Sequence, residues 1–264
     1  MKVERRVPER AVSVRENEVI KVQEPQASRR ERLRTMAGRE VGRKTGLFIV
    51  PEIVTFDDSR GEIVFERLKL TGLREMLADD SRSVELAGQA ARALAAIHGH
   101  MKLADEATVQ SGGFGPERTV PLHGDFGMRN IFGLSDSDDI AIIDWANADW
   151  IGIDTDRGPA EIDVAVFLVS LFHRSVIGPW PISRRHEVAR HFLATYATAS
   201  PQGVSIEGLR SIVTAVSPSF ARLNRRLKGS LRALGYRHGA IDLYFFLRRL
   251  SGDDFAARRE PHTG

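Results

Sequence analysis

Residues 121–145 read PLHGDFGMRNIFGLSDSDDIAIIDW, and this stretch carries most of the information in the sequence about fold and chemistry. Asp125 and Asn130 stand five positions apart in an expected loop, and Asp144 ends the apolar run IAII. Two carboxylates and one amide offer the hard oxygen ligands that hold Mg²⁺ between a base and a chain of phosphates. A single Asp in a turn is usually a local cap, so the prediction depends on the ordered combination.

The same stretch resembles a known catalytic segment. LHGDFGMRNIF at 122–132 resembles the catalytic loop of the aminoglycoside phosphotransferase and choline kinase group, which has a protein-kinase-like fold. IIDW at 142–145 is similar to the metal-binding segment of that group, and GPAEIDVA at 158–165 resembles the element that follows it. The resemblance extends over roughly residues 18–170 and is strongest over 121–165.

This resemblance implies a role for each matching residue. Asp125 resembles the catalytic base that orients the acceptor hydroxyl, and Asn130 and Asp144 resemble the two ligands of Mg²⁺. His123 is similar to the histidine that braces the loop, and Asp163 matches the acid that holds it. A lone histidine is more often a hydrogen-bonded core residue than a catalyst, so we expect a structural role for His123.

The phosphate-binding lysine is expected near the N-terminus. Lys21 lies in an alternating, Val-rich run and resembles the strand lysine that holds the α- and β-phosphates of ATP. Its partner would be a glutamate on the next helix, for which we favour Glu40 over Glu31. The alternative is that the charges of this helix form ordinary exposed ion pairs.

An adenine site is expected where the first lobe ends. IVFERL at 63–68 resembles the last strand of that lobe, so the backbone C=O of Glu66 and the backbone N–H of Leu68 would meet the adenine edge. No glycine precedes Gly38, so no glycine-rich phosphate loop stands before Lys21, and other backbone amides would have to replace it. No Ala-Pro-Glu peptide-docking signature follows, which favours small molecules over protein substrates.

Residue patterning predicts a sheet-rich start and a helix-rich remainder. The first part is expected to hold a hairpin at 11–22, a polar helix at 26–46 and strands at 49–55 and 62–68. The rest is expected to hold a loop at 104–119 and helices at 73–77, 84–100, 161–175, 183–199, 205–215, 217–234 and 239–250. This order indicates an α+β chain in two lobes, and the resemblance implies that its fold is the protein-kinase-like one. We expect a small antiparallel-sheet N-lobe over 1–68, a mainly helical C-lobe over 69–250 and a disordered tail over 251–264.

Composition excludes several classes of protein. The 264 residues are 42% hydrophobic and 28% charged, which is ordinary for a globular chain. No apolar run approaches the ~20 residues that cross a bilayer, so membrane insertion is not expected. The chain has no cysteine, which excludes disulfides and thiolate zinc sites, and its charged N-terminus lacks an apolar secretory segment. We therefore expect a cytoplasmic protein.

Charge is segregated along the chain. Residues 1–50 carry a net charge of +6, residues 51–172 carry −12 and residues 173–264 carry +9. The acidic central segment suits a metal site, and the basic ends suit an anionic ligand. The alternative is that most of these charged residues only lie on solvent-exposed surfaces. The basic ends also allow an RNA-associated protein, but no nucleic-acid motif is recognisable and no nucleic-acid partner is expected.

Together these patterns predict a kinase that moves the γ-phosphoryl group of ATP, with Mg²⁺, to a hydroxyl of a small molecule. Residues 173–250 hold 13 Lys and Arg against three carboxylates, which favours a neutral or anionic acceptor such as a sugar or sugar phosphate. The alternative is that these arginines only solvate helices or face another protein. The competing function is a catalytically weak nucleotide-binding or scaffold protein on the same fold, which the missing glycine loop favours.

Overall fold

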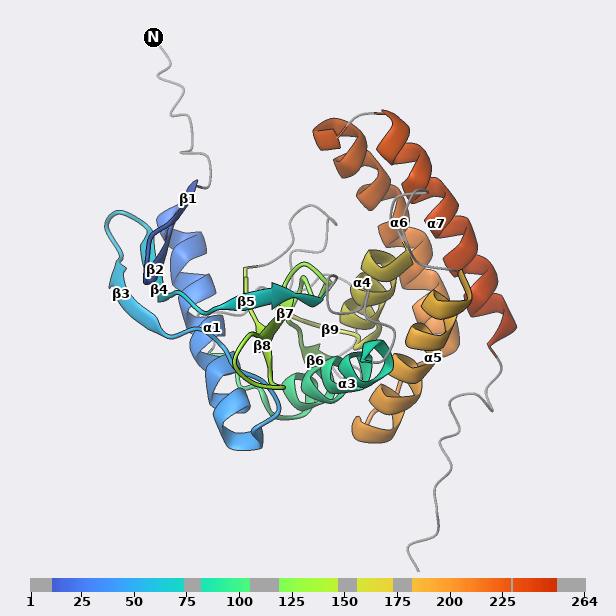
Figure 1. Cartoon of the computed structure of the whole chain (residues 1–264), viewed down its shortest axis with the longest axis horizontal. Helices are drawn as coiled ribbons and strands as arrows, with labels where there is room; N and C mark the ends of the chain where they lie inside the picture. Colours follow the sequence, from blue (N-terminus) through green and yellow to red (C-terminus); the bar gives the residue numbers. More distant parts are fainter. Residues whose placement is uncertain are drawn as a thin grey trace, which may run out of the picture.

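The computed structural model describes residues 11–73, 82–104, 119–146, 156–172, 182–228 and 230–250, without the side chains of residues 182 and 219–238. Most of the expected helix at 73–77, most of the loop at 104–119 and the whole tail at 251–264 lie outside the described residues. Figure 1 shows a sheet and helix α1 at one end, a group of helices at the other end and short strands between them. The expected α+β architecture is confirmed.

The N-terminal sheet has four antiparallel strands in the order β1-β2-β4-β3. Its strands are β1 (Ala11–Val14), β2 (Glu18–Val22), β3 (Ile53–Asp57) and β4 (Glu62–Glu66). The predicted hairpin is confirmed, because β1 pairs with β2 in a register that places Val12 opposite Lys21 and Val14 opposite Val19. The strand expected to start at residue 49 starts at Ile53. Ile49 is instead held in a bridge to a second sheet, where it bonds to Ile140 and Ile142.

Helix α1 (Pro25–Thr45) joins β2 to β3. It begins where the Glu24 side chain accepts a hydrogen bond from the N–H of Ala27, and it ends at Gly46 in the left-handed conformation. The helix is strongly polar, yet its inner face buries Glu31, Arg34 and Val41. Buried polar groups need partners, so this helix depends on what its inner face contacts.

Short strands connect the two ends of the molecule. A three-stranded sheet has the order β5-β7-β8, and a two-stranded ladder pairs β6 with β9. These strands are β5 (Leu70–Gly72), β6 (Val120–Pro121), β7 (Ile131–Leu134), β8 (Ile140–Ile142) and β9 (Arg157–Gly158). The chain therefore leaves the first sheet after Glu66 and enters the second at Leu70, close to the place where the lobes are expected to join.

Five described helices complete the fold. They are α3 (Ser83–His100), α4 (Glu161–Phe172), α5 (Ile182–Ala199), α6 (Ile206–Lys228) and α7 (Ser230–Arg249). Helix α4 is buried along nearly its whole length, and its apolar residues form the centre of the core with α3, α5, α6 and α7. No described helix is long and apolar enough to cross a membrane.

Two predicted helix boundaries near the C-terminus are wrong. A break was expected before residue 217 and another between 234 and 239, whereas α6 continues through Pro218 and α7 starts at Ser230. Proline removes one helix hydrogen bond, but it does not end a helix that packing holds in place. Buried Leu209, Val213 and Val216 line one face of α6 and keep it against its neighbours.

Candidate active site

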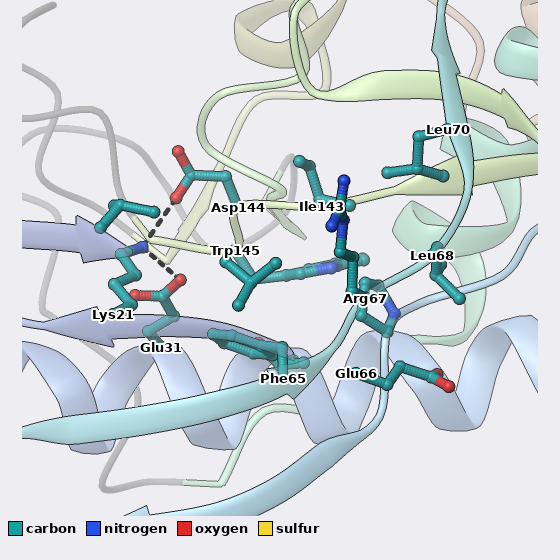
Figure 2. Close-up of a pocket in the computed structure, with 14 residues that line it drawn as sticks. Lys21, Glu31, Phe65, Glu66, Arg67, Leu68, Leu70, Ile143, Asp144 and Trp145 are labelled. Atoms are coloured by element: carbon teal, nitrogen blue, oxygen red, sulfur yellow. Dashed lines mark hydrogen bonds and ion pairs between the residues drawn. The ribbon is translucent and has the colours of Figure 1, made fainter. Parts of the chain in front are cut away.

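A pocket lies where the N-terminal sheet meets the second sheet (Figure 2). One wall comes from β1 and β2, through Val12, Val19 and Lys21. The segment after β4 and the segment after β8 supply the other walls, from Phe65 to Leu68 and from Ile143 to Trp145. Val12 is exposed because it projects over this pocket from the same face of the sheet as Lys21.

Lys21 is buried at the inner end of the pocket and contacts two carboxylates. Its Nζ atom donates to Glu31 and, over 2.9 Å, to Oδ1 of Asp144 (Figure 2). Gln23 also donates to Glu31, over 2.7 Å, which fixes the second carboxylate oxygen. Because both oxygens of Glu31 are occupied, the lysine is held in one place.

The expected pairing of Lys21 with Glu40 is wrong. Glu40 is exposed and its nearest cationic partner is Arg43, at 3.7 Å on the same helix. Nine residues separate Glu31 from Glu40, and nine steps of about 100° bring a helical side chain to the opposite face. Glu31 faces the sheet, so Glu40 faces solvent.

The catalytic-loop residues lie next to one another as the sequence predicts. Asn130 donates its amide N–H₂ to the backbone C=O of Asp125 at 2.9 Å and to Oδ2 of the same residue at 3.0 Å. Arg129 donates to that same Oδ2. Oδ1 of Asp125 is buried and has no hydrogen-bond partner among the described residues. The carboxylate is therefore oriented through one oxygen, and the other is available to a further donor.

Burial raises the pKa of Asp125 to about 6, because the ionised carboxylate is poorly hydrated in this buried position. The guanidinium of Arg129 opposes this shift and Asp144 adds to it. A carboxyl whose pKa lies near neutrality can accept a proton from an alcohol as the alcohol reacts. The position and the proton affinity of Asp125 both suit a general base.

Asp163 holds the catalytic loop from the first turn of α4. Its carboxylate accepts backbone N–H groups from His123 at 2.7 Å and Gly124 at 2.8 Å. Nε2 of His98 lies 3.1 Å from the same carboxylate, and Nδ1 of His98 lies 2.6 Å from the hydroxyl of Tyr196. Because a carboxylate only accepts, His98 donates through Nε2 and accepts the tyrosine O–H at Nδ1.

The pKa of Asp163 is lowered: burial would raise it, but the hydrogen bond from His98 and the backbone hydrogen bond from His123 are among the interactions that outweigh burial. His123 is fully buried between the rings of Phe126 and Trp145, and burial lowers its pKa to about 4. A histidine that stays neutral at physiological pH does not supply charge here. Its packing fits the structural role expected for it.

The two expected metal ligands are neighbours across the β7–β8 pair. Ile143 donates its backbone N–H to the backbone C=O of Asn130 at 3.0 Å, which places Asp144 beside Asn130. Asp144 has φ near 60°, a conformation uncommon outside glycine that turns its carboxylate towards Lys21. Among the described residues no group of three or more His, Cys, Asp or Glu side chains forms a metal cage. A cation held by Asn130 and Asp144 would take its other ligands from phosphates and water, as Mg²⁺ does.

The structure places Glu66 and Leu68 in the pocket wall, where the adenine contacts are expected. The residue between them, Arg67, points its backbone N–H to the C=O of Asn17 at 2.9 Å and its guanidinium to the C=O of Arg15 at 3.0 Å. These bonds tie the segment to the β1–β2 turn. They do not test the backbone contacts to adenine, which stay a prediction.

Sequence reasoning missed three buried residues of this site. His98 and Tyr196 support Asp163, and Arg34 of α1 bonds to the backbone of the catalytic loop. The motif LAAIH at 94–98 offers a weak signal for His98. Nothing in the sequence distinguishes Arg34 from the five other arginines in the polar segment that forms α1.

Solved structures with a similar fold include small-molecule kinases. A glucosamine kinase superposes with a TM-score of 0.58 at 16% identity, over 91% of this chain and 78% of that chain. An amicoumacin kinase gives 0.55 at 13% identity over 94% and 84%, and APH(2'')-IIa in complex with gentamicin gives 0.50 at 13% over 93% and 90%. This chain has the fold of the small-molecule kinases.

The kinase-like fold confirms the architecture that the resemblance implied. Comparisons with family models and with curated protein sequences found no match. At 13–16% identity these neighbours establish the fold alone, so residue roles in this kinase-like chain depend on its own geometry.

Proposed function

We propose that this chain is an ATP-dependent phosphotransferase that moves the γ-phosphoryl group to a hydroxyl of a small molecule. One observation carries the proposal: Lys21, Glu31 and Asp144 form one buried cluster, and Asp125 is oriented by Asn130 beside it. Phosphoryl transfer needs a cation on the donor phosphates, a metal site and a base at the acceptor. These five residues supply the protein groups for the phosphate-binding cation, the metal site and the base.

The donor nucleotide would occupy the pocket of Figure 2. Its adenine would lie between the valines of β1 and β2 and the segment from Glu66 to Leu68, and its phosphates would extend towards Lys21. The ammonium of Lys21 would then exchange its contact with Asp144 for phosphate oxygens while Glu31 keeps it in place. No glycine loop precedes Lys21, so this lysine carries more of the phosphate contact.

Asn130 and Asp144 are the proposed holders of Mg²⁺. Both offer oxygen atoms, and the backbone bond from Ile143 to Asn130 keeps the two residues adjacent. When bound, Mg²⁺ would neutralise negative charge on the phosphates. Asp125, through its unpartnered Oδ1, would accept the hydrogen bond of the acceptor hydroxyl and orient that oxygen towards the γ-phosphorus.

The acceptor is proposed to be a neutral or anionic metabolite, with a sugar as the leading class. One structural neighbour is a glucosamine kinase in complex with glucosamine, and another is APH(2'')-IIa in complex with gentamicin. The +9 charge of residues 173–264 favours a neutral or anionic molecule. Part of this charge already has protein partners: Arg184 bonds to Glu187 and Arg210 to the C=O of Leu247.

The test is a screen of ATP consumption across hydroxyl metabolites with Mg²⁺. Asp125→Asn is expected to lose nearly all turnover while ATP still binds, because Asp125 handles the acceptor and not the donor. Asp136→Asn is the matched control, since Asp136 is exposed near the opposite end of the β7–β8 pair. Turnover in Asp125→Asn close to that of the wild type would overturn the assignment of the base. Tight ATP binding without any acceptor turnover would instead support the scaffold function.

A further inference from the structure

Arg34 is a fully buried arginine on the inner face of the polar helix α1. All three of its guanidinium nitrogens are occupied. Nε donates to the backbone C=O of Trp145 at 2.8 Å, and Nη2 donates to the C=O of Leu122 at 2.7 Å and of His123 at 2.8 Å. Nη1 forms an ion pair with Asp156, which is also fully buried.

The partners of Arg34 come from three separate segments of the candidate site. Leu122 and His123 lead into the loop that carries Asp125, and Trp145 directly follows Asp144. Asp156 precedes β9, and its backbone C=O accepts the N–H of Leu122 at 2.9 Å. One side chain of α1 therefore fixes the catalytic loop and the metal-binding segment relative to each other.

The same helix carries Glu31 one turn before Arg34, so both side chains lie on one face. Arg30 adds a second bond to Asp156 at 3.0 Å. One turn further along, Gly38 lets the indole ring of Trp145 lie directly against the helix backbone. A continuous face of α1 thus contacts Lys21, the backbone just before Asp125 and the backbone just after Asp144.

We propose that Arg34 is a positioning residue that joins the Lys21–Glu31 pair to the catalytic loop. The inference rests on the proposed function, because it assigns Arg34 to the same site. The ion pair between Lys21 and Glu31 and the loop around Asp125 both contact α1, and Arg34 is the side chain of α1 that bonds to the loop.

The geometry requires arginine and excludes lysine. A guanidinium presents donors in a rigid plane, and here they point to three carbonyls and one carboxylate. An ammonium on a flexible stem retains the charge opposite Asp156 but cannot reach all four acceptors. Arg34→Lys therefore separates the positioning role from simple charge neutralisation.

The first measurement is hydrogen exchange of the ligand-free protein, with Arg39→Gln as control. Arg39 lies on the same helix and also has an ion pair, with Glu52 at 2.7 Å, but it is exposed. Arg34→Lys is expected to accelerate exchange about tenfold over residues 119–131, while α3 and α4 keep their protection. Faster exchange spread evenly over the whole chain would mean a merely structural role and would overturn the proposal. Asp156→Asn is the second variant if Arg34→Lys does not fold.

The second measurement is ATP affinity in a double-mutant cycle. Arg34→Lys and Glu31→Gln are each expected to weaken ATP binding about tenfold. The double variant is expected to lose less affinity than the product of the two single losses. Fully additive effects, or an unchanged affinity in Arg34→Lys, would overturn the coupling. If the wild type does not bind ATP at all, the proposed function fails, whereas the exchange measurement still decides whether Arg34 positions the loop.

Discussion

Nζ of Lys21 lies 2.9 Å from Oδ1 of Asp144, although 123 positions separate the two residues in the sequence. The same ammonium contacts Glu31 from α1, so one buried cation joins the N-terminal sheet, the helix and the metal-binding segment. Two carboxylates on one ammonium leave the cluster with an excess negative charge. Such a cluster has a place for a second cation, which is how we interpret the site.

Replacing Glu31 should weaken the protein far more than replacing Glu40. Glu31→Gln removes a buried charge that orients Lys21 and accepts from Gln23, so we expect a loss of about 1–3 kcal/mol in the free energy of unfolding. Glu40→Gln changes an exposed residue and should stay within about 0.5 kcal/mol. Urea unfolding of both variants measures this difference. Equal losses in the two variants would contradict the assignment of Glu31 as the partner.

Mg²⁺ should strengthen ATP binding, and Asp144→Ala should remove most of that gain. The carboxylate of Asp144 lies beside Asn130 and Lys21, where metal and phosphate would meet. Titration calorimetry with and without Mg²⁺ measures the gain in each protein, and Asp136→Ala serves as the control. ATP binding that is independent of metal in the wild type would favour a scaffold function over phosphoryl transfer.

The catalytic segment could be predicted from sequence because its residues are close together in the chain. Asp125, Asn130 and Asp144 lie within twenty positions, and a loop and one strand pair bring them together. Which glutamate pairs with Lys21 depends on which face of α1 turns towards the sheet. The i,i+4 pattern of charges on a polar helix does not show which face turns to the sheet, so the preference for Glu40 over Glu31 had no support from the pattern and was wrong.

Arg34 was unpredictable for a related reason. Its partners are mostly backbone carbonyls 88 to 111 positions away. Every residue has a backbone carbonyl, so the sequence does not show which of them accepts a hydrogen bond. The continuation of α6 through Pro218 also depends on tertiary packing, through apolar side chains that face neighbouring helices. Local patterns thus predicted that Asp125, Asn130 and Asp144 lie close together, while the supports of the site required the three-dimensional structure.

Gly38→Ala should destabilise the protein, although alanine is the better helix former. A methyl group at position 38 would overlap the indole ring of Trp145, which is buried and held by its neighbours. Forced overpacking of this kind costs about 1–3 kcal/mol. Gly99→Ala is the control, because nothing lies near its added methyl group, and it should be neutral or slightly stabilising. Thermal unfolding of the two variants distinguishes them, and a stabilised Gly38→Ala would contradict the close contact of α1 with Trp145.

A neutral sugar or sugar phosphate should be a better acceptor than a polycationic aminoglycoside. The net charge of +9 over residues 173–264 repels a polycation by about 1 kcal/mol per close pair of charges in water, and by more in a partly dry cleft. The ratio of kcat/KM for the two classes measures this preference. A preference of about tenfold or more for the aminoglycoside, which is about 1.4 kcal/mol, would refute the charge argument and leave the proposed phosphotransferase intact.

Asp125→Asn should stabilise the ligand-free protein at neutral pH and not at pH 4. The pKa of Asp125 in the folded protein is about 6, above its ordinary value of 3.8, so the folded state binds more protons than the unfolded state between these two values. Stability contributed by this group is therefore lost as pH rises from about 4 to about 6, and the loss persists above pH 6. Two pKa units correspond to about 3 kcal/mol, and the asparagine variant lacks this loss.

Unfolding of both proteins by urea from pH 4 to pH 8, without Mg²⁺, should give stability curves that diverge between about pH 4 and pH 6. The catalytic rate of the wild type should fall below about pH 6, as the base becomes protonated. Parallel stability curves would show that the carboxylate ionises normally, and Asp125 would then lack the raised proton affinity that suits it to act as the base.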